Sequence, residues 1–425
     1  MRLIVFAGLI LVSASTAKQE IIELPITLVD GYGTLSFGSE KLRRETMVPD
    51  DSWYKTEQHN LKGLPSDWTD LVRQTIWFDG QQFSYQNYKQ GLISESDFNE
   101  TKTSWNIDLN KRPYSEKPIK CFVYIVHGKK NDVLTYKIDT DNDYDFSDEK
   151  EFSAVKSVFA KKDSIAKHCS QQVTYEAFRN GKVTTLKAPV LIVQFWGSMW
   201  ANIPQHAEAN FQGSKILISS SNFGSSSYDP AAIREAVSKS LDETVKEHEF
   251  ISIAGRTYQN MGVDINKQVL RLKKIPQDSV IYSSQVGFNA LPFSGNDFIT
   301  NEKVNLENYK GKFLFMDFWG TWCGPCVADL PNIKKAFTTL DKTKIEFLGV
   351  ANDDTETLKK FLLKEKIDWK QLQCAEETGI IDEYNITGFP TTFLIDPNGK
   401  IIDKGLHGEY LTDTLKAHIT RWTKK

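Results

Sequence analysis

Two cysteines separated by two residues, Cys323 and Cys326, are the side chains whose type and spacing most clearly allow chemistry. The apolar run Phe313–Phe318 precedes them, and a helical pattern, Val327–Leu340, follows them. An apolar run of this length, bounded by turn residues, is typical of a buried parallel strand. We therefore expect both cysteines to lie where a strand ends and a helix begins.

This position predicts different roles for the two sulfurs. The unpaired N–H groups and the dipole at the amino end of a helix favour an anion, so the thiol of Cys323 should have a lowered pKa. Cys323 is then the attacking sulfur, and Cys326, one turn further along, is the resolving sulfur. Gly324 and Pro325 keep the pair close enough to close a disulfide ring, and a proline is tolerated in the first turn of a helix.

Two carboxylates are candidates for the base that deprotonates Cys326. Asp317 interrupts the apolar strand, and burial would raise its pKa toward neutrality, where a carboxylate can accept a proton. Asp329 follows Cys326 by three residues, on the same face of the helix. Asp329 could equally be a solvated acid that the helix dipole stabilises.

These residues resemble thioredoxin-fold proteins, and more narrowly the TlpA/ResA group of extracytoplasmic thiol-disulfide oxidoreductases. The resemblance covers about the last third of the chain. It rests on the motif DFWGTWCGPC, the helix proline Pro331, the segment Gly388–Thr391, the entry Leu291–Phe293 and the lead-in Leu306–Lys312. The group usually has a glutamate where this chain has Asp329, and many of its members lack an acid at the position of Asp317.

The resemblance implies an enzyme that reduces or exchanges protein disulfides through its Cys-Gly-Pro-Cys pair and requires no cofactor. It implies a cis Phe389–Pro390 peptide bond that faces the disulfide. The implied substrate groove is formed by Trp322, Gly324, Pro325, Phe389 and Pro390. The Gly-Pro dipeptide resembles that of reducing thioredoxins, whose potential is about −270 mV, so reduction is favoured over oxidation.

For residues 286–425 we expect an α/β thioredoxin-fold domain, preceded by a linker, Lys274–Val286. Strands and helices alternate there, which predicts a mixed sheet with helices on both faces. The predicted strands are Phe313–Phe318, Ile345–Ala351, Trp369–Cys374, Thr391–Ile395 and Lys400–Gly405. The predicted helices are Cys323–Leu340, Thr355–Lys366, Thr378–Tyr384 and Tyr410–Trp422. The unit around Val350–Lys366 matches the insertion that separates the TlpA/ResA group from plain thioredoxins.

Residues 18–285 are predicted to form a β-rich region, organised as an antiparallel sandwich or barrel. We divide it into 18–150 and 151–285, which could also be one domain. Short strands recur between turn-rich loops, with a hairpin of Lys120–Val126 and Asp132–Ile138 joined by 127–131. Further strands are predicted at 21–29, 33–37, 75–78, 188–196, 215–219, 250–254 and 269–273, and a helix from Asp229 to about His248.

An acidic loop follows the hairpin and has carboxylates at every second residue. Oxygen ligands at this spacing can surround a hard cation, so structural calcium is one interpretation and a solvated acidic loop is the other. The candidate ligands are Asp139, Asp141, Asp143, Asp145 and Glu149. Tyr144 stands where calcium loops usually have glycine, and Lys150 where they have a bidentate acid.

The N-terminus and the composition indicate the compartment and the partners. A positive start, an apolar segment Leu3–Val12 and small residues Ser15–Ala17 predict a signal peptide over residues 1–17. We therefore expect an exported protein without a stable membrane span, in the periplasm of a Gram-negative envelope. Its partners would be exported proteins with disulfides and a membrane thiol relay that donates electrons. The net charge of −3 does not indicate nucleic-acid binding.

Other interpretations of the cysteines and of the β-rich region stay open. A peroxiredoxin-like peroxidase would need a threonine three residues before the reactive cysteine, where this chain has Gly320. The Cys323–Cys326 pair could be half a zinc site, although no second such pair occurs in the chain. The β-rich region could bind a partner, with the thiol domain as an accessory. Cys121 and Cys169 could form a structural disulfide.

Overall fold

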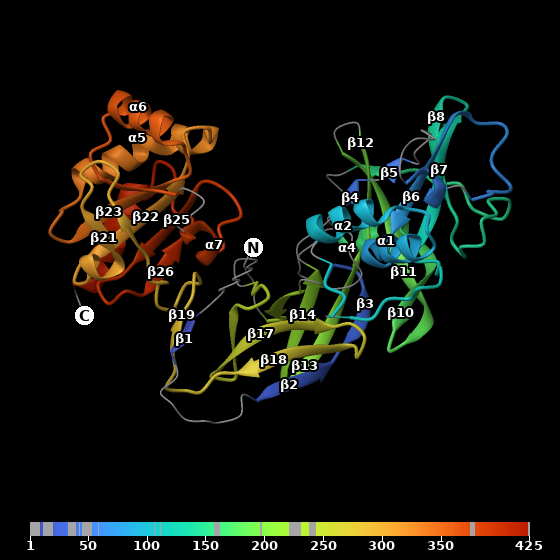
Figure 1. Ribbon diagram of the computed structural model, residues 1–425, viewed down its shortest axis with the longest axis horizontal. Helices are drawn as coiled ribbons and strands as arrows, with labels where there is room; N and C mark the ends of the chain where they lie inside the picture. The colour runs from blue at the N-terminus through green and yellow to red at the C-terminus, as the bar shows by residue number, and fades with distance from the viewer. Residues whose placement is uncertain are drawn as a thin grey trace. The chain divides into compact units, whose positions relative to one another are not determined.

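The computed structural model of the protein describes residues 9–11, 20–32, 40–41, 43–44, 53–57, 59–105, 107–110, 112–156, 162–195, 198–220, 231–237, 244–374 and 379–423. The chain forms two compact units, Gln19–Ile275 and Pro276–Lys425, and strand β1 (Leu9–Leu11) belongs to the second (Figure 1). The other parts of the predicted signal peptide and the predicted strand at 33–37 lie outside the described residues.

The C-terminal unit is built on a five-stranded mixed sheet in the order β24-β23-β22-β25-β26. The central strand β22 pairs in parallel with β23 and antiparallel with β25. The strands are β22 (Phe313–Trp319), β23 (Ile345–Ala351), β24 (Lys370–Gln373), β25 (Thr391–Ile395) and β26 (Ile401–Lys404). β22 is buried throughout, as the apolar run predicts.

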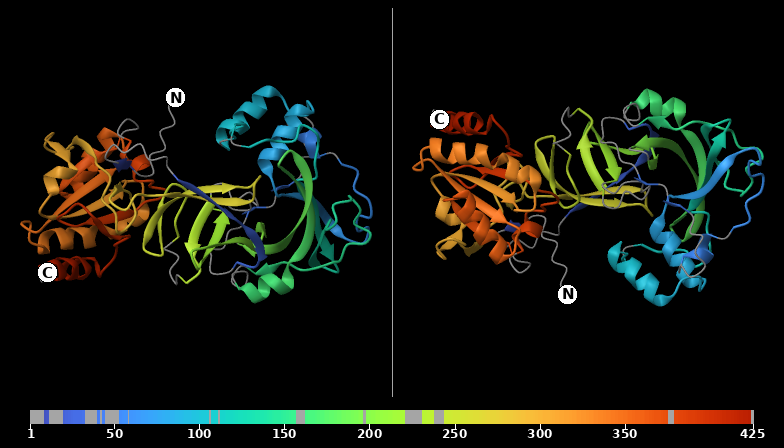
Figure 2. Two further views of the ribbon diagram at one scale, coloured as in Figure 1. Left: turned by 90° about the horizontal axis from the view of Figure 1, so that it is seen from below. Right: turned by 90° about the horizontal axis from the view of Figure 1, so that it is seen from above.

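Alternating side chains of β22 enter two different cores. Phe313, Phe315 and Trp319 pack under α5 (Gly324–Thr339), α6 (Thr355–Glu365) and α8 (Leu411–Trp422). Leu314, Met316 and Phe318 pack on the opposite face, against α7 (Ile380–Glu383), η3 (Leu306–Tyr309) and the preceding chain. Figure 2 shows α8 alongside α5 on one face of the sheet. Helices thus cover both faces, which confirms the predicted thioredoxin-type α/β domain.

Element ends in this unit agree with the prediction to within a few residues. A short pair, β20 (Ser294–Asn296) and β21 (Lys303–Asn305), precedes the main sheet. The predicted linker contains a strand, β19 (Val280–Tyr282), which pairs antiparallel with β1. Cys374, expected to be a buried apolar side chain, is buried in the same core as Phe318 and Phe393.

The described residues of the N-terminal unit form largely antiparallel strands in four sheets, as the sequence predicts at that level. One pair of sheets encloses a single core. These sheets are β15-β14-β13-β3 and β16-β17-β18-β2. Their strands are β2 (Ile21–Pro25), β3 (Thr27–Asp30), β13 (Gln205–Phe211), β14 (Ser214–Ser220), β15 (Ala231–Glu235), β16 (Phe250–Ile253), β17 (Arg256–Asp264) and β18 (Val269–Lys274).

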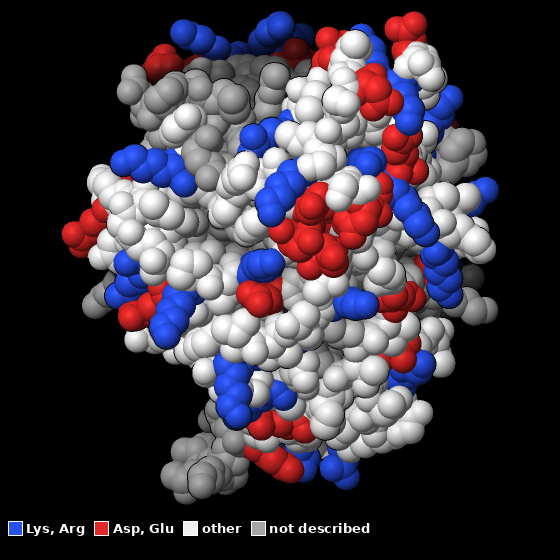
Figure 3. Space-filling view, turned by 90° about the vertical axis from the view of Figure 1, so that its right-hand side faces the viewer, with Lys and Arg blue, Asp and Glu red and all other residues white. Residues whose placement is uncertain are grey.

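A second core lies between the sheets β5-β6-β7-β8 and β10-β11-β12-β4, and β9 pairs with β11. The strands are β4 (Glu40–Lys41), β5 (Arg43–Arg44), β6 (Thr69–Trp77), β7 (Phe122–Lys130), β8 (Val133–Ile138), β9 (Val155–Lys156), β10 (Gln171–Arg179), β11 (Lys182–Phe195) and β12 (Ser198–Asn202). The prediction that this region is an antiparallel sandwich or barrel stays a prediction. On the face drawn in Figure 3, acidic and basic side chains are both spread over the surface, and one larger cluster of acidic side chains lies near the centre.

The structure corrects the prediction of helices in this unit. The segment predicted as a helix from Asp229 to His248 contains strand β15, which pairs with β14 and places Ile233 in the core. Helices that the pattern did not reveal are α1 (Gly80–Lys89), α2 (Glu95–Ser104) and α4 (Asp163–Cys169), with a short 3-10 turn, η1 (Tyr54–Glu57). Asp79 caps α1, and Ser94 and Asp97 form a capping box on α2.

The predicted hairpin is confirmed, but its turn lies further along the chain. β7 continues to Lys130, and the turn is made by Asn131 and Asp132, which both have positive φ values, 51° and 62°. Two consecutive residues of this conformation form the tight turn that matches the twist of paired strands. Residues 127–130, predicted as loop, therefore belong to the strand.

A disulfide between Cys121 and Cys169 does not form, because both thiols are free. Cys121 packs with Phe83 of α1 on one outer face of the second core, whereas Cys169 packs against Leu191 and Val193 on the other. The core between β7 and β11 separates them. Burial raises the pKa of the Cys121 thiol well above its usual range.

Candidate active site

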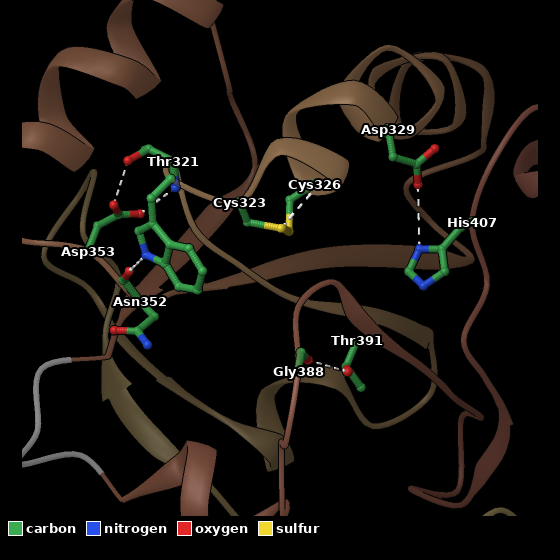
Figure 4. The surroundings of a disulfide bond; sticks show 10 residues. Thr321, Cys323, Cys326, Asp329, Asn352, Asp353, Gly388, Thr391 and His407 are labelled. Atoms are coloured by element: carbon green, nitrogen blue, oxygen red, sulfur yellow. Dashed lines mark hydrogen bonds and ion pairs between the residues drawn. A yellow bond between two sulfur atoms is a disulfide. The ribbon is translucent and has the colours of Figure 1, made fainter. Parts of the chain in front are cut away.

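Cys323 and Cys326 are joined by a disulfide at the junction of β22 and α5, where the sequence places them (Figure 4). Their Cα atoms are 5.3 Å apart. Cys323 is the N-cap of α5, and its Sγ accepts a hydrogen bond from the backbone N–H of Cys326 at 3.2 Å. Both cysteines are buried, with 4% and 5% of their surface exposed. A backbone N–H directed at Sγ can also stabilise a thiolate there.

An aromatic pair flanks the disulfide. Trp322 is 62% exposed, and its ring meets that of Phe389 nearly edge-on, with the ring centroids 5.4 Å apart. The Phe389–Pro390 peptide bond is cis, as the resemblance implies. The preceding residue, Gly388, accepts a hydrogen bond on its carbonyl oxygen from Thr391 Oγ1 at 2.8 Å, below the disulfide in Figure 4. Gly324 and Pro325 form the first turn of α5, and an added Cβ at Gly324 would meet no atom within 4 Å.

The turn before Cys323 is held by the loop between β23 and α6. Thr321 donates two hydrogen bonds to Asp353, from its N–H at 2.8 Å and from its hydroxyl at 2.5 Å. Trp322 Nε1 donates to the carbonyl oxygen of Asn352 at 2.7 Å. An added Cβ at Gly320 would lie 2.7 Å from Trp322 Nε1, so the indole occupies the space that a side chain would need.

Asp317 lies on the face of β22 that α5 covers. Its neighbours in the alternation, Phe315 and Trp319, share a core with Cys326. Burial, and secondarily the charge of Asp329, raises the pKa of Asp317 to about 7. Among the described residues, no hydrogen-bond partner meets its Oδ1 atom. Asp317 therefore has the environment of a carboxylate that can exchange a proton near neutral pH.

Asp329 is not a solvated acid, which corrects one of the two interpretations of this residue. It is 9% exposed, and its Oδ1 accepts from the Gly408 N–H at 2.9 Å and from Asn332 Nδ2 at 2.7 Å. Its Oδ2 lies 3.5 Å from Nδ1 of His407. In the described part of the chain, no hydrogen bond joins Asp329 to Cys326. The charge of Asp329 is instead the second cause, after burial, of the raised pKa of Asp317.

Sequence reasoning missed Asn352, Asp353 and His407. Asn352 and His407 contact the predicted site residues Trp322 and Asp329, and Asp353 contacts Thr321, the residue before Trp322. For Asn352 and Asp353, the sequence signal is their position. Asn352 and Asp353 follow the carboxyl end of β23, which pairs in parallel with β22, so both strands end at one edge of the sheet. His407 had no such signal, because it lies in a loop between β26 and α8.

The acidic loop brings together three of its five predicted ligands. One carboxylate oxygen from each of Asp139, Asp141 and Asp143 lies within 4.8 Å of the others. Asp139 is buried and accepts from the N–H groups of Asp143 and Tyr144, and burial raises its pKa to about 6. Tyr144 has φ of 70°, the conformation that glycine usually supplies in calcium loops.

The other two predicted ligands are directed elsewhere. Asp145 Oδ1 accepts from the Ser147 N–H at 2.9 Å, and Glu149 Oε1 accepts from the Thr140 hydroxyl at 2.9 Å. Calcium binding therefore stays a prediction, carried by three carboxylates instead of five.

The AhpC/TSA family model matches residues 286–404. ResA, a thiol-disulfide oxidoreductase from Bacillus cereus, is 31% identical over 139 residues, which are 33% of this chain and 79% of the relative. ResA from Geobacillus kaustophilus is 32% identical over 135 residues, 32% of this chain and 76% of the relative. The chain belongs to the ResA family of thiol-disulfide oxidoreductases. As in the ResA family, thiol-disulfide exchange uses the cysteine sulfurs themselves and needs no cofactor.

Solved structures of thiol-disulfide oxidoreductases are also similar to part of this chain. The thioredoxin domain of a thiol-disulfide oxidoreductase from Bacteroides vulgatus is 30% identical, with a TM-score of 0.30, over 32% of this chain and 97% of that one. A thiol:disulfide interchange protein from Bacteroides sp. is 30% identical, with a TM-score of 0.30, over 32% of this chain and 90% of that one. Within the described residues of this ResA-family chain, no helix has the length and apolar character needed to cross a membrane.

Proposed function

We propose that the Cys323–Cys326 pair reduces or exchanges disulfides of exported proteins outside the cytoplasm. The observation that carries the proposal is the seat of Cys323 at the N-cap of α5, where the Cys326 N–H is directed at its sulfur. That N–H and the helix dipole lower the free energy of a Cys323 thiolate. The N-terminal apolar segment, interpreted as a signal peptide, supports export to the periplasm of a Gram-negative envelope.

The reaction proceeds through a mixed disulfide. The Cys323 thiolate attacks one sulfur of the partner's disulfide; a Cys323–partner bond forms, and the other partner sulfur leaves as a thiolate. Cys326 then attacks the Cys323 sulfur, the Cys323–Cys326 bond forms, and the second partner sulfur leaves. Two electrons pass from the cysteine pair to the partner, and a membrane thiol relay restores them by the reverse exchange.

Asp317 is the proposed acceptor of the Cys326 proton. With a pKa of about 7, its carboxylate is ionised in a useful fraction at neutral pH and still basic enough to take a proton. Asp329 supports this role indirectly, because its charge contributes to the raised pKa of Asp317.

The direct test is to trap partners with Cys326→Ser, since the mixed disulfide at Cys323 can then not resolve. We expect covalent complexes that a reducing agent releases, and none with Cys323→Ser or the double variant. Equal trapping by Cys326→Ser and Cys323→Ser would contradict the assignment of Cys323 as the attacking sulfur.

The direction of electron flow is tested by the reduction potential of the pair. A value near about −270 mV supports a reductase, whereas one near about −120 mV, as in strong oxidants, would reverse the proposed direction.

A peroxidase is the second candidate, because the matching family model is described as AhpC/TSA. Gly320 argues against it, because a peroxidase would need threonine at this position. The Cβ of a threonine there would lie 2.7 Å from Trp322 Nε1 and 3.2 Å from the Asn352 carbonyl oxygen. Consumption of hydrogen peroxide with a thiol donor, dependent on Cys323, would favour the peroxidase.

A partner-binding role for the compact unit Gln19–Ile275 is compatible with either activity. It predicts that partners recovered by trapping also bind the Cys323→Ser/Cys326→Ser chain without a covalent bond.

A further inference from the structure

We infer that Asp353 is a positioning residue for exchange at Cys323, acting through the turn that carries Trp322; this rests on the function proposed above. Asp353 lies on the loop between β23 and α6 and binds both hydrogen-bond donors of Thr321, two residues before Cys323. Figure 4 shows the two carboxylate oxygens directed at the Thr321 N–H and hydroxyl.

The same loop forms two further hydrogen bonds, with Trp319 and Trp322. The Asn352 N–H donates to the Trp319 carbonyl oxygen at 2.9 Å, and the Asn352 carbonyl oxygen accepts from Trp322 Nε1 at 2.7 Å. The turn itself is closed by the Cys323 N–H, which donates to the Gly320 carbonyl oxygen at 3.1 Å. Trp319, Thr321 and Trp322 are therefore all tied to one two-residue segment.

The loop is anchored in turn to the sheet. Gln373 of β24 donates from Nε2 to the Asp353 carbonyl oxygen at 2.9 Å, and its side chain also hydrogen-bonds Thr355. Gln371 of the same strand accepts from the indole N–H of Trp319 at 3.0 Å. Side chains of strand β24 thus fix the position of the turn. The place of β24 in the sequence does not indicate this role.

The hydrogen bonds from Thr321 to Asp353 matter because they help to position the next residue, Trp322, an exposed side chain beside two buried sulfurs. A partner must place its disulfide within reach of Cys323 while it packs against Trp322 and Phe389. Misplacement of a reacting group by about 1 Å can cost on the order of 100-fold in rate. Loss of the hydrogen bonds from Thr321 would allow both Trp322 and the backbone before Cys323 to move. The reaction with a small reagent that does not pack against Trp322 would be little affected.

Asp354 offers a matched control. It is the next residue, carries the same charge, and caps α6 by accepting from the Thr357 N–H at 3.0 Å; among the described residues, no hydrogen bond joins its side chain to the turn. Asp353→Asn and Asp354→Asn therefore remove the same charge from the same loop, but only the first leaves the two donors of Thr321 with one acceptor oxygen in place of two.

The experiment uses the reduced full-length chain and compares two reagents that the Cys323 thiolate attacks. The first is a peptide that contains a disulfide, and the second is iodoacetamide, which needs no docking surface. We expect Asp353→Asn to slow exchange with the peptide by about tenfold or more, and alkylation by less than about twofold. Asp354→Asn should leave both rates within about twofold, and Thr321→Ser, which retains both donors, should behave like the wild type.

Two outcomes would overturn the inference: an Asp353→Asn rate with the peptide that equals the wild-type rate, or equal slowing by both reagents. Failure of the proposed function is recognised separately, because Cys323→Ser would then retain the exchange activity. If Asp353→Asn fails to fold, Thr321→Val, which removes only the hydroxyl donor, must slow peptide exchange selectively for the inference to stand.

Discussion

Replacement of Asp317 by asparagine tests the electrostatics of the site most sharply. The pKa of this carboxyl rises from 3.8 to about 7 on folding. Between these values the folded chain keeps the proton that the unfolded chain has lost, so the free energy of unfolding falls as the pH rises. At 1.36 kcal/mol per pKa unit, the full penalty is about 4 kcal/mol, reached above pH 7 and absent below pH 4.

Asp317→Asn removes this penalty. The difference in unfolding free energy between variant and wild type should therefore grow by up to about 4 kcal/mol in favour of the variant from below pH 4 to pH 8. Unfolding of the C-terminal unit can be followed in urea by labelling the buried thiol of Cys374 with a pyridyl disulfide that reacts at acid pH. The oxidised chain is used, so that Cys323 and Cys326 stay bonded.

The pH dependence of the difference, and not its size at one pH, carries the test, because asparagine also changes local hydrogen bonding by a constant amount. Asp341→Asn is the matched control: this exposed acid has a lowered pKa, caused by hydrogen bonds from Thr343, so its loss should cost stability as the pH rises. A difference for Asp317→Asn that stays flat between pH 4 and pH 8 would refute the proposed environment.

Three further predictions follow from the described contacts. Asp329→Asn removes the charge that helps to raise the pKa of Asp317, so the pH midpoint of the resolving step should move to lower pH in stopped-flow kinetics; an unchanged midpoint would remove Asp329 from the mechanism. Gly320→Ala should displace the indole of Trp322 and slow peptide exchange by about tenfold or more, with a shifted fluorescence maximum as the sign of displacement. Millimolar calcium should raise the thermal midpoint of the wild type but not of Asp139→Asn, and no rise in the wild type would leave the acidic loop solvated.

The C-terminal unit was predictable because its sequence signals agree at several levels. β22 is an uninterrupted apolar run except for Asp317, and α5 starts at Cys323 with a proline in its first turn. Long, strongly periodic elements such as β23 and α6 leave few competing interpretations. The domain could therefore be laid out almost element by element.

The N-terminal unit was harder for identifiable reasons. α1 has the sequence GQQFSYQNYK, whose polar glutamines and asparagines weaken the apolar periodicity, although Asp79 supplies an N-cap signal. β15 begins with two alanines, which favour a helix locally. Pairing with β14 and burial of Ile233 between two sheets override that preference, and neither contact can be read from the local sequence.

In the active site, the cysteines and Asp317 were predictable, whereas their supports were not. The hydrogen bond from Thr321 to Asp353 joins residues 32 positions apart, and the ion pair of His407 with Asp329 joins residues 78 positions apart. No local spacing in the sequence reveals such contacts. The choice between a solvated and a buried Asp329 was likewise decided by the loop at Gly408, which is 79 positions away.

The shielding of the disulfide has a consequence for the shape of its partners. About a twentieth of the surface of each cysteine is exposed, whereas Trp322 beside them is largely exposed. A disulfide set flush into a rigid, rounded protein would strike the indole before it reached sulfur. We therefore expect the enzyme to act on disulfides that protrude from their partner, in strained loops, extended tails or incompletely folded chains. Disulfides that lie flush with the surface of a mature globular protein should not be reduced.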